Sequence, residues 1–237
     1  MTRNENVLSV PHDGILLIDK PKGVTSFDCI RMLRKKLGVQ KPLHASHRVK
    51  MGHAGTLDPL ATGLMIIGVG RGTKKLSNYL KLPKTYRAEI MFGVRTDTGD
   101  MDGTIVEEAD ASDLSRDAVA DVLVGMVGDI TLPVPRYSAI KRGGKRLYAL
   151  ARTGVAFVPP ERVMHIDRAE LMDIFSDDDD HHRIAVVDLA VASGTYIRSI
   201  AEHLGEKMGL PATLRNLRRT SIGSFCVDDA YRLSKDS

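Results

Sequence analysis

The residues best suited to chemistry lie in segment 51–63, a glycine-flanked loop with Asp58 near its centre. From Cys29 to Ala88, Asp58 is the only acidic residue, whereas the same window holds thirteen Lys and Arg. A lone carboxylate suits a nucleophile or a general base, because a neighbouring Arg would keep it ionised at neutral pH. An Asp in such a loop more commonly caps a helix or turn, and residue type alone favours that capping role.

Charge is segregated along the chain. Its 237 residues carry a net charge of +4, with 43% hydrophobic and 27% charged positions, enough to bury one large core or two small ones. Residues 97–129 hold ten acids and one base, whereas residues 130–160 hold six bases and no acid. This pattern predicts a basic face with an acidic back, and hence a nucleic acid or another phosphate-rich ligand.

Cysteine content and hydropathy indicate the cellular compartment of the protein. The only cysteines are Cys29 and Cys226, too few for a disulfide framework, and the first residues form no apolar signal segment. Segment 64–69, the longest apolar candidate, has the length of a strand rather than of a membrane span. We therefore expect a cytoplasmic protein, and the lack of a coiled-coil pattern favours a monomer.

Periodicity predicts the elements that position this loop. Strands are expected at 14–19, 61–70, 84–92, 162–174, 183–192 and 213–222, and helices at 26–37, 73–80, 115–127, 147–152 and 199–208. Together they predict an α+β fold, a mixed and largely antiparallel central sheet with flanking helices and a basic catalytic cleft.

Local patterns also predict a helix cap, a loop and the orientation of one strand. We expect Ser26 to be the N-cap of its helix, with Gly38 after the last turn. Segment 39–56 shows no periodicity and is predicted to be a long exposed loop. In the strand 84–92, Tyr86 should face the same side as Ala88, Ile90 and Phe92.

Two further segments bear on binding. Ser193 to Arg198 should be extended, so that Tyr196 and Arg198 share a side. Residues 133–153 mix prolines, glycines, tyrosines and bases, which is typical of a basic RNA-binding flap. Its bases include Lys141, Arg142 and Lys145.

No pattern predicts a metal or cofactor. Three histidines at 44, 47 and 53 have spacings that make a weak metal site, and a solvated loop or phosphate contacts are the alternatives. Glycines at 68–72 lack the spacing of a nucleotide-binding loop, and segment 96–103 lacks the closing Glu of a calcium loop. The acidic tip 177–182 is assigned no function.

Segment 53–63 closely resembles the catalytic motif of the tRNA pseudouridine synthase B (TruB) family. Segments 14–23, 84–87, 95–103, 137–141, 193–198 and 217–219 support the resemblance in the right order. It covers residues 14 to about 223. It implies the pseudouridine synthase fold and an isomerase that converts the uridine at position 55 in the T loop of tRNA to pseudouridine, without metal or organic cofactor.

The resemblance also implies roles for single residues. Asp58 would be the catalytic aspartate, Tyr86 would stack on the flipped-out base and assist proton removal, and Arg198 would pair with Asp58. His53 would fill the space left by the extruded nucleotide. Lys74, Tyr196 and Leu217 would line the pocket, and Arg31, Lys35 and the flap would contact the RNA backbone. Whether Asp58 attacks the sugar, attacks the base or removes a sugar proton stays open.

One departure from the family is the end of the chain. Only fourteen residues follow Gly223, so we expect a single catalytic domain without the C-terminal RNA-binding (PUA) domain of bacterial relatives. Either this member works without that domain or the sequence is a shortened form. The alternatives to the T-loop activity are a synthase for another RNA uridine, guide-dependent or not, and a non-catalytic tRNA chaperone. The flap favours a stand-alone enzyme with no required protein partner.

Overall fold

The chain forms two compact units in a computed structural model that describes residues 13–36, 49–138, 140–153, 157–178 and 180–234. The first unit comprises residues 1–85 and 218–237, and the second comprises residues 86–217. Strand β4 (Lys84–Phe92) begins in the first unit and ends in the second, whereas β12 (Ala212–Ile222) runs from the second into the first.

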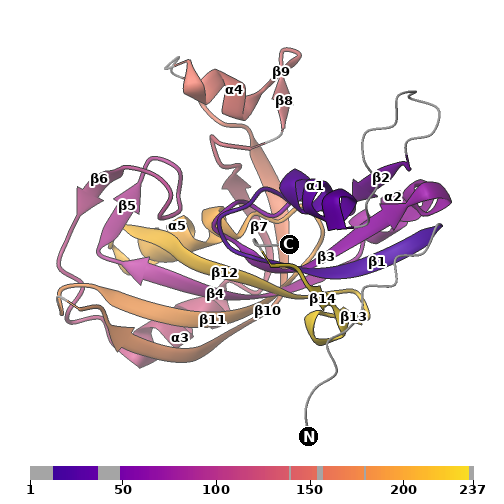
Figure 1. Ribbon diagram of the computed structural model, residues 1–237. Helices are drawn as coiled ribbons and strands as arrows, with labels where there is room; N and C mark the ends of the chain where they lie inside the picture. Colours follow the sequence, from indigo (N-terminus) through magenta and orange to yellow (C-terminus); the bar gives the residue numbers. More distant parts are fainter. Residues whose placement is uncertain (1–12, 37–48, 139, 154–156, 179, 235–237) are drawn as a thin grey trace, which may run out of the picture. The chain divides into compact units, whose positions relative to one another are not determined.

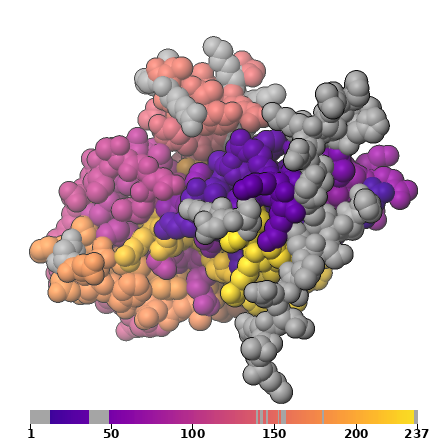
Figure 2. All heavy atoms as spheres, in the orientation of Figure 1, coloured from indigo at the N-terminus to yellow at the C-terminus, as the bar shows by residue number. Residues whose placement is uncertain are grey.

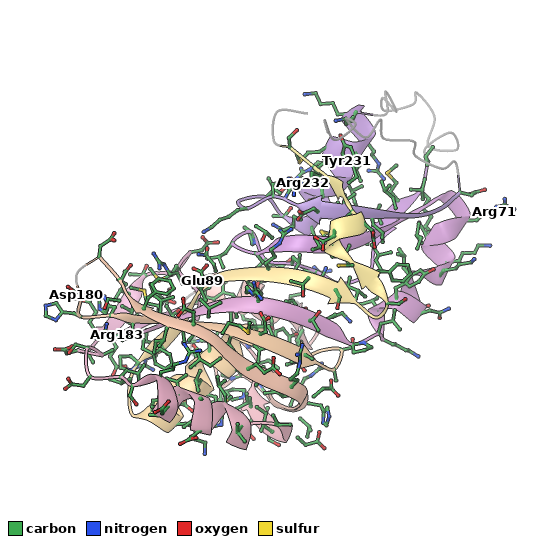
Figure 3. All side chains as sticks on the ribbon, turned by 90° about the horizontal axis from the view of Figure 1, so that it is seen from below. Arg71, Glu89, Asp180, Arg183, Tyr231 and Arg232 are labelled. Atoms are coloured by element: carbon green, nitrogen blue, oxygen red, sulfur yellow. The ribbon has the colours of Figure 1, made fainter. Side chains whose placement is uncertain are left out.

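The first unit is built on a sheet with the strand order β14-β1-β3-β12, in which β2 pairs with β3 and β13 with β12. Its elements are β1 (Gly14–Lys20), α1 (Ser26–Lys36), β2 (Met51–His53), β3 (Thr62–Val69), the 3-10 helix η2 (Gly70–Lys75), α2 (Leu76–Leu80), β13 (Phe225–Cys226), η3 (Val227–Asp229) and β14 (Tyr231–Arg232). The pairs β1–β14 and β3–β12 are parallel, and the others are antiparallel. Figure 3 labels Tyr231 and Arg232 on the edge strand β14.

Burial in the first unit centres on β3. Its run Gly-Leu-Met-Ile-Ile-Gly-Val is buried throughout. Helix α1 lies on one side of this sheet (Figure 1), and apolar side chains of β1, α2 and β13 pack against the cluster around Leu64 and Ile66. Leu64 and Ile66 pack with Ala54, Ile222 and Val227. The exposed face of α1 forms part of the surface in Figure 2, where it is indigo.

The second unit contains a sheet with the strand order β12-β4-β11-β10-β7 and two separate hairpins, β5–β6 and β8–β9. Its elements are β5 (Val94–Thr96), β6 (Ile105–Glu108), α3 (Arg116–Gly125), β7 (Gly128–Pro133), β8 (Lys141–Arg142), β9 (Lys145–Arg146), α4 (Leu147–Arg152), β10 (Glu161–Ser176), β11 (Arg183–Val191) and α5 (Ile197–Met208). The long β10 pairs antiparallel with both β11 and β7. Helix α3 packs on β10, α5 packs on β7, and the two helices contact each other.

The β10–β11 hairpin ends at the acidic tip. Figure 3 labels Asp180 and Arg183 there. Asp177 forms an ion pair with Arg215, 3.3 Å between side-chain atoms, and the guanidinium of Arg183 donates to the carbonyl oxygen of Ser112. These contacts within the second unit give the tip a structural use.

The α+β fold with a mixed, largely antiparallel sheet is confirmed, and so is most of the local pattern. Strand β4 has the predicted bounds, and Tyr86, Ala88, Ile90 and Phe92 are all buried on one face. Ser115 accepts the backbone N–H of Ala118 as the N-cap of α3. The prediction for the end of that helix was wrong, because Val127 lies beyond the last helical turn and is largely exposed.

Other corrections concern element ends. The strand predicted at 14–19 extends one residue further, because Lys20 is the last residue of β1 and is buried. Within the predicted loop 39–56, residues 51–53 form β2, because they pair with the buried β3; residues 39–48, like Gly38, lie outside the described residues. The predicted helix 73–80 is a 3-10 turn followed by the short α2.

Candidate active site

The Asp58 loop, residues 54–61, connects β2 to β3 in the first unit. Asp58 is half-buried, whereas its neighbours Leu57, Leu60 and Ala61 are buried. The backbone N–H of Ala61 donates to the carbonyl oxygen of Asp58 at 3.1 Å and closes a tight turn. Apolar side chains on both sides of Asp58 therefore anchor the loop and leave its carboxylate nearer the surface.

Three buried side chains hold alternate carbonyl groups of this loop. Arg219 Nη2 donates to Gly55 at 3.3 Å, Ser26 Oγ to Leu57 at 2.9 Å, and Lys20 Nζ to Pro59 at 3.3 Å. The three donor side chains belong to residues that are almost fully buried: Arg219, Ser26 and Lys20 are exposed by 1%, 3% and 1%. The backbone N–H of Gly23 also donates to the Pro59 oxygen, at 2.7 Å. Donors from β1, α1 and β12 thus fix the backbone on either side of Asp58.

The predicted N-cap role of Ser26 was wrong, because Thr25 caps α1. The Thr25 hydroxyl accepts the backbone N–H of Asp28, and the Asp28 carboxylate accepts the backbone N–H of Thr25. This is the reciprocal pattern of a capping box. It leaves the Ser26 hydroxyl free of the helix end, and Ser26 instead accepts the N–H of Leu57 and donates to its carbonyl.

Basic groups gather against the same loop. Lys84 is buried and donates to the carbonyl oxygens of Leu80 and Leu82. Burial, and secondarily the charge of Arg219, lowers the pKa of Lys84 to about 8. A Cβ atom added at Gly55 would lie 3.5 Å from Arg219 and 3.9 Å from Lys84, so both cations reach the loop.

His53, the last residue of β2, is held by pairing with Ile67 of β3. Burial lowers the pKa of its ring, a backbone hydrogen bond with Gly55 opposes this, and the charge of Arg219 lowers it further. Burial and the charge of Arg219 thus favour the uncharged form of the ring. Among described residues its Nδ1 is buried without a hydrogen-bond partner. An uncharged ring suits packing against a nucleotide better than pairing with phosphate.

Arg218 and Arg219 of β12 connect this strand to two different neighbours. Arg218 makes two hydrogen bonds to the carboxylate of Asp19, at 3.0 and 2.7 Å. Arg219 donates from Nε to the Leu64 carbonyl at 2.7 Å. One arginine therefore ties β12 to β1, and the other ties it to β3 and to the Asp58 loop.

In the second unit, Tyr86 and Arg198 are both buried. Arg198 donates from Nη1 to the carbonyl of Thr98 and from Nη2 to that of Tyr137, each at 2.9 Å, and its Nε lies 3.6 Å from the Asp100 carboxylate. The extended conformation predicted at Arg198 was wrong, because α5 begins at Ile197. Arg198 thus joins α5, the 96–103 turn and the start of the flap.

The remaining predicted site residues differ in exposure. Tyr196, the N-cap residue of α5, and Leu217 of β12 are half-buried, whereas Lys74 of η2 is exposed. Arg31 and Lys35 are exposed on α1, where Arg31 lies over the Phe27 ring at 5.6 Å. Lys141, Arg142 and Lys145 belong to the β8–β9 hairpin, which Figure 1 shows with α4 standing off the sheet of its unit.

These residues divide between the units. His53, Asp58 and Lys74 belong to the first, and the second contributes Tyr86, Tyr196, Arg198 and Leu217. The pairing of Asp58 with Arg198 joins residues of different units and stays a prediction. The sequence reasoning gave no role to Lys20, Ser26, Lys84 or Arg219 in holding the loop, although all four lie in or beside the motif segments.

Within the described ranges, no group of three or more His, Cys, Asp or Glu could hold a metal ion. Over those same ranges, no helix is long and apolar enough to cross a membrane. The chemistry available at the Asp58 loop is that of one carboxylate beside buried cations, which suits acid/base or nucleophilic work on an anionic polymer.

Solved structures share this fold. One, a Cbf5–Nop10–Gar1 complex, is 25% identical with a TM-score of 0.67, and the match covers 94% of this chain and 53% of that one. Another, an H/ACA RNP bound to a substrate RNA containing 2′-deoxyuridine, is 22% identical with a TM-score of 0.64, covering 97% and 58%. The chain therefore spans a little over half the length of these structural relatives.

A family model and named relatives match most of this chain. The model described as "TruB family pseudouridylate synthase (N terminal domain)" matches residues 40–197, so the fold and the Asp58 loop are those of a pseudouridine synthase. The tRNA pseudouridine synthase B of Gloeobacter violaceus is 41% identical, over 94% of this chain and 72% of the relative. That of Symbiobacterium thermophilum is 40% identical, over 99% and 75%. The chain belongs to the TruB family and is an isomerase that forms pseudouridine in tRNA.

Proposed function

We propose that the chain isomerises the uridine at position 55 in the T loop of tRNA and that Asp58 is its catalytic carboxylate. The observation that carries this proposal is the Asp58 loop itself, a single carboxylate whose backbone is fixed on both sides by buried donors. A rigidly held group is what a reaction needs when it must meet one atom of an extruded nucleotide.

The reaction needs no external reactant. The bond between N1 of uracil and the sugar C1′ breaks, the base turns, and a bond forms between C5 and C1′. The C5 proton leaves to solvent and N1 gains a proton, so atoms and electrons balance. One carboxylate could attack C1′, attack the base, or remove a sugar proton, and Tyr86 and Arg198 are proposed to hold the base and Asp58.

The basic flap is proposed to close on the T arm. Residues 133–153 include the β8–β9 hairpin with Lys141, Arg142 and Lys145, and no acid. On the first unit, exposed Phe27 and Arg31 on α1 offer a ring and a guanidinium side by side, a pairing suited to RNA. Recognition is proposed to depend on the shape of the stem-loop and on its phosphates.

We also propose that the chain acts as a monomer in the cytoplasm, as one catalytic domain that uses no cofactor, guide RNA or protein partner. The relatives named tRNA pseudouridine synthase B support stand-alone action over guide-dependent action. The solved relatives, in contrast, are parts of larger complexes. Purified chain alone should therefore modify an isolated T-arm stem-loop. A requirement for a further component would refute this part.

The test of the catalytic role is Asp58→Asn, assayed by tritium release from a T-arm stem-loop labelled at C5 of uridine. Release should fall below about one part in a thousand of the wild-type rate, since the only proposed carboxylate is gone. Asp113→Asn, the same change at an exposed residue, should keep the rate. Wild-type turnover by Asp58→Asn would refute the assignment. Retained stem-loop binding by the inactive variant would leave a chaperone contribution open.

A further inference from the structure

Ser26 makes an unusual pair of contacts. Its Oγ accepts the backbone N–H of Leu57 at 2.8 Å and donates to the carbonyl oxygen of the same residue at 2.9 Å. One side chain thereby satisfies both backbone groups of the residue immediately before Asp58. In an antiparallel sheet, a neighbouring strand makes this pair of bonds with its own N–H and C=O. Here one hydroxyl replaces that strand.

Both partners of this contact are buried. Ser26 is 3% exposed and Leu57 4% exposed, so water has little access to either group. Thr25 provides the cap of α1, so the hydroxyl of Ser26 is not needed for the helix end. The contact spans 31 residues of sequence. Its effect is therefore to fix the loop rather than to stabilise α1.

Neighbouring contacts fix the loop at Gly55 and Pro59, whereas Ser26 holds the backbone groups of Leu57. Arg219 holds the Gly55 carbonyl, and Lys20 with the Gly23 N–H holds that of Pro59. Each of these lies two residues from Leu57. Loss of the Ser26 hydroxyl would leave the N–H and C=O next to Asp58 unpaired in a buried place, so the backbone there would shift toward other partners.

We propose that Ser26 is a positioning residue for pseudouridine formation, which sets the place of the Asp58 carboxylate through Leu57. The proposal rests on the proposed function of Asp58. Because Ser26 acts on the backbone of the loop, its loss should lower the turnover number and leave RNA binding intact. A misplacement of about 1 Å at a reacting group lowers rates by roughly 100-fold.

The test compares Ser26→Ala with Thr25→Ala in the full chain. For Ser26→Ala we expect kcat on the T-arm stem-loop to fall roughly 10- to 100-fold, with KM within threefold of wild type. Thr25→Ala destabilises the same helix but keeps the contact to Leu57, so its kcat should stay within threefold when measured well below its unfolding temperature. Ser26→Thr keeps a hydroxyl and should recover most of kcat.

A second measurement does not depend on activity. Amide hydrogen exchange of Leu57 should speed up at least tenfold in Ser26→Ala and stay unchanged in Thr25→Ala. Wild-type kcat in Ser26→Ala, or an equal loss in both variants, would overturn the proposal. If Asp58→Asn is inactive while Ser26→Ala is normal, only the Ser26 role fails. If Asp58→Asn is active, the catalytic assignment fails, and the Leu57 exchange still decides whether Ser26 fixes the loop.

Discussion

Replacing Gly63 by Ala should damage the first unit far more than its size suggests. Gly63 lies in β3, two residues after the Asp58 loop. It has φ +105° and pairs with Lys20 of β1 and with Arg219 of β12. An added Cβ would lie 2.3 Å from the carbonyl oxygen of Arg219 and 2.7 Å from its nitrogen. Ordinary contact begins at 3.4 Å, so the strands must separate by 3.4 − 2.3 = 1.1 Å.

The magnitude follows from three effects. A left-handed backbone at a residue with a Cβ costs about 1–2 kcal/mol. Backbone movement to admit an extra methyl costs about 1–3 kcal/mol. Stretching the ladder weakens one or two hydrogen bonds, at about 1 kcal/mol each. We expect a loss of about 3–6 kcal/mol in the free energy of unfolding, a large share of the 5–15 kcal/mol typical of proteins.

Gly125→Ala is the matched control, because it makes the same chemical change in open space. Gly125 ends α3, is exposed, and a Cβ there would meet nothing within 4 Å. Its substitution should stabilise the chain by about 0.5–1 kcal/mol, since Ala is the better helix former. The two variants should therefore shift the midpoint of urea unfolding, monitored by circular dichroism, in opposite directions. A Gly63→Ala variant within about 1 kcal/mol of wild type would refute the close approach of β3 and β12.

Two further predictions concern the basic groups. Lys84 has a folded-state pKa near 8 against 10.5 for the free side chain, so the unfolded chain binds the extra proton between these values and stability should rise as pH increases from 8 to 10.5. The rise should be about 1–3 kcal/mol and should be absent in Lys84→Met; parallel pH curves in denaturant titrations would refute it. Changing Lys141, Arg142 and Lys145 to Gln should weaken stem-loop binding and lower the slope of log K against log salt by about 1 to 3. An unchanged slope would show that the flap does not contact phosphates.

Local patterns in the sequence predicted most of the fold. The bounds of β4 and α4 agree with their predictions, because alternation in one and a short apolar helix in the other are set by neighbours in the chain. The capping of α3 by Ser115 follows from the same kind of local rule. The predictions agree best with the structure where burial of one face of an element requires apolar residues at regular intervals in the sequence.

Long-range polar contacts could not be predicted in this way. Two hydroxyl residues, Thr25 and Ser26, stand side by side. The acid three positions after Thr25 is a local signal that Thr25 caps α1, but nothing local indicates that Ser26 contacts Leu57, 31 positions away. Arg219 reaches Leu64 across 155 positions. Lysines are seldom buried, so Lys20 and Lys84 were not expected inside. The family motifs contain Lys20, Lys84 and Arg219 without indicating their contacts.

The isolation of Asp58 among cations gains a physical reason from these contacts. Arg219 and Lys84 direct their donors at carbonyl oxygens, which satisfy the hydrogen bonds without adding a negative charge. The lowered pKa of Lys84 shows that the region holds positive charge at a cost. A second carboxylate between Cys29 and Ala88 would reduce that cost by pairing with these cations. Its absence leaves the positive field to act on Asp58 from within the fold and on the phosphates of an RNA from outside.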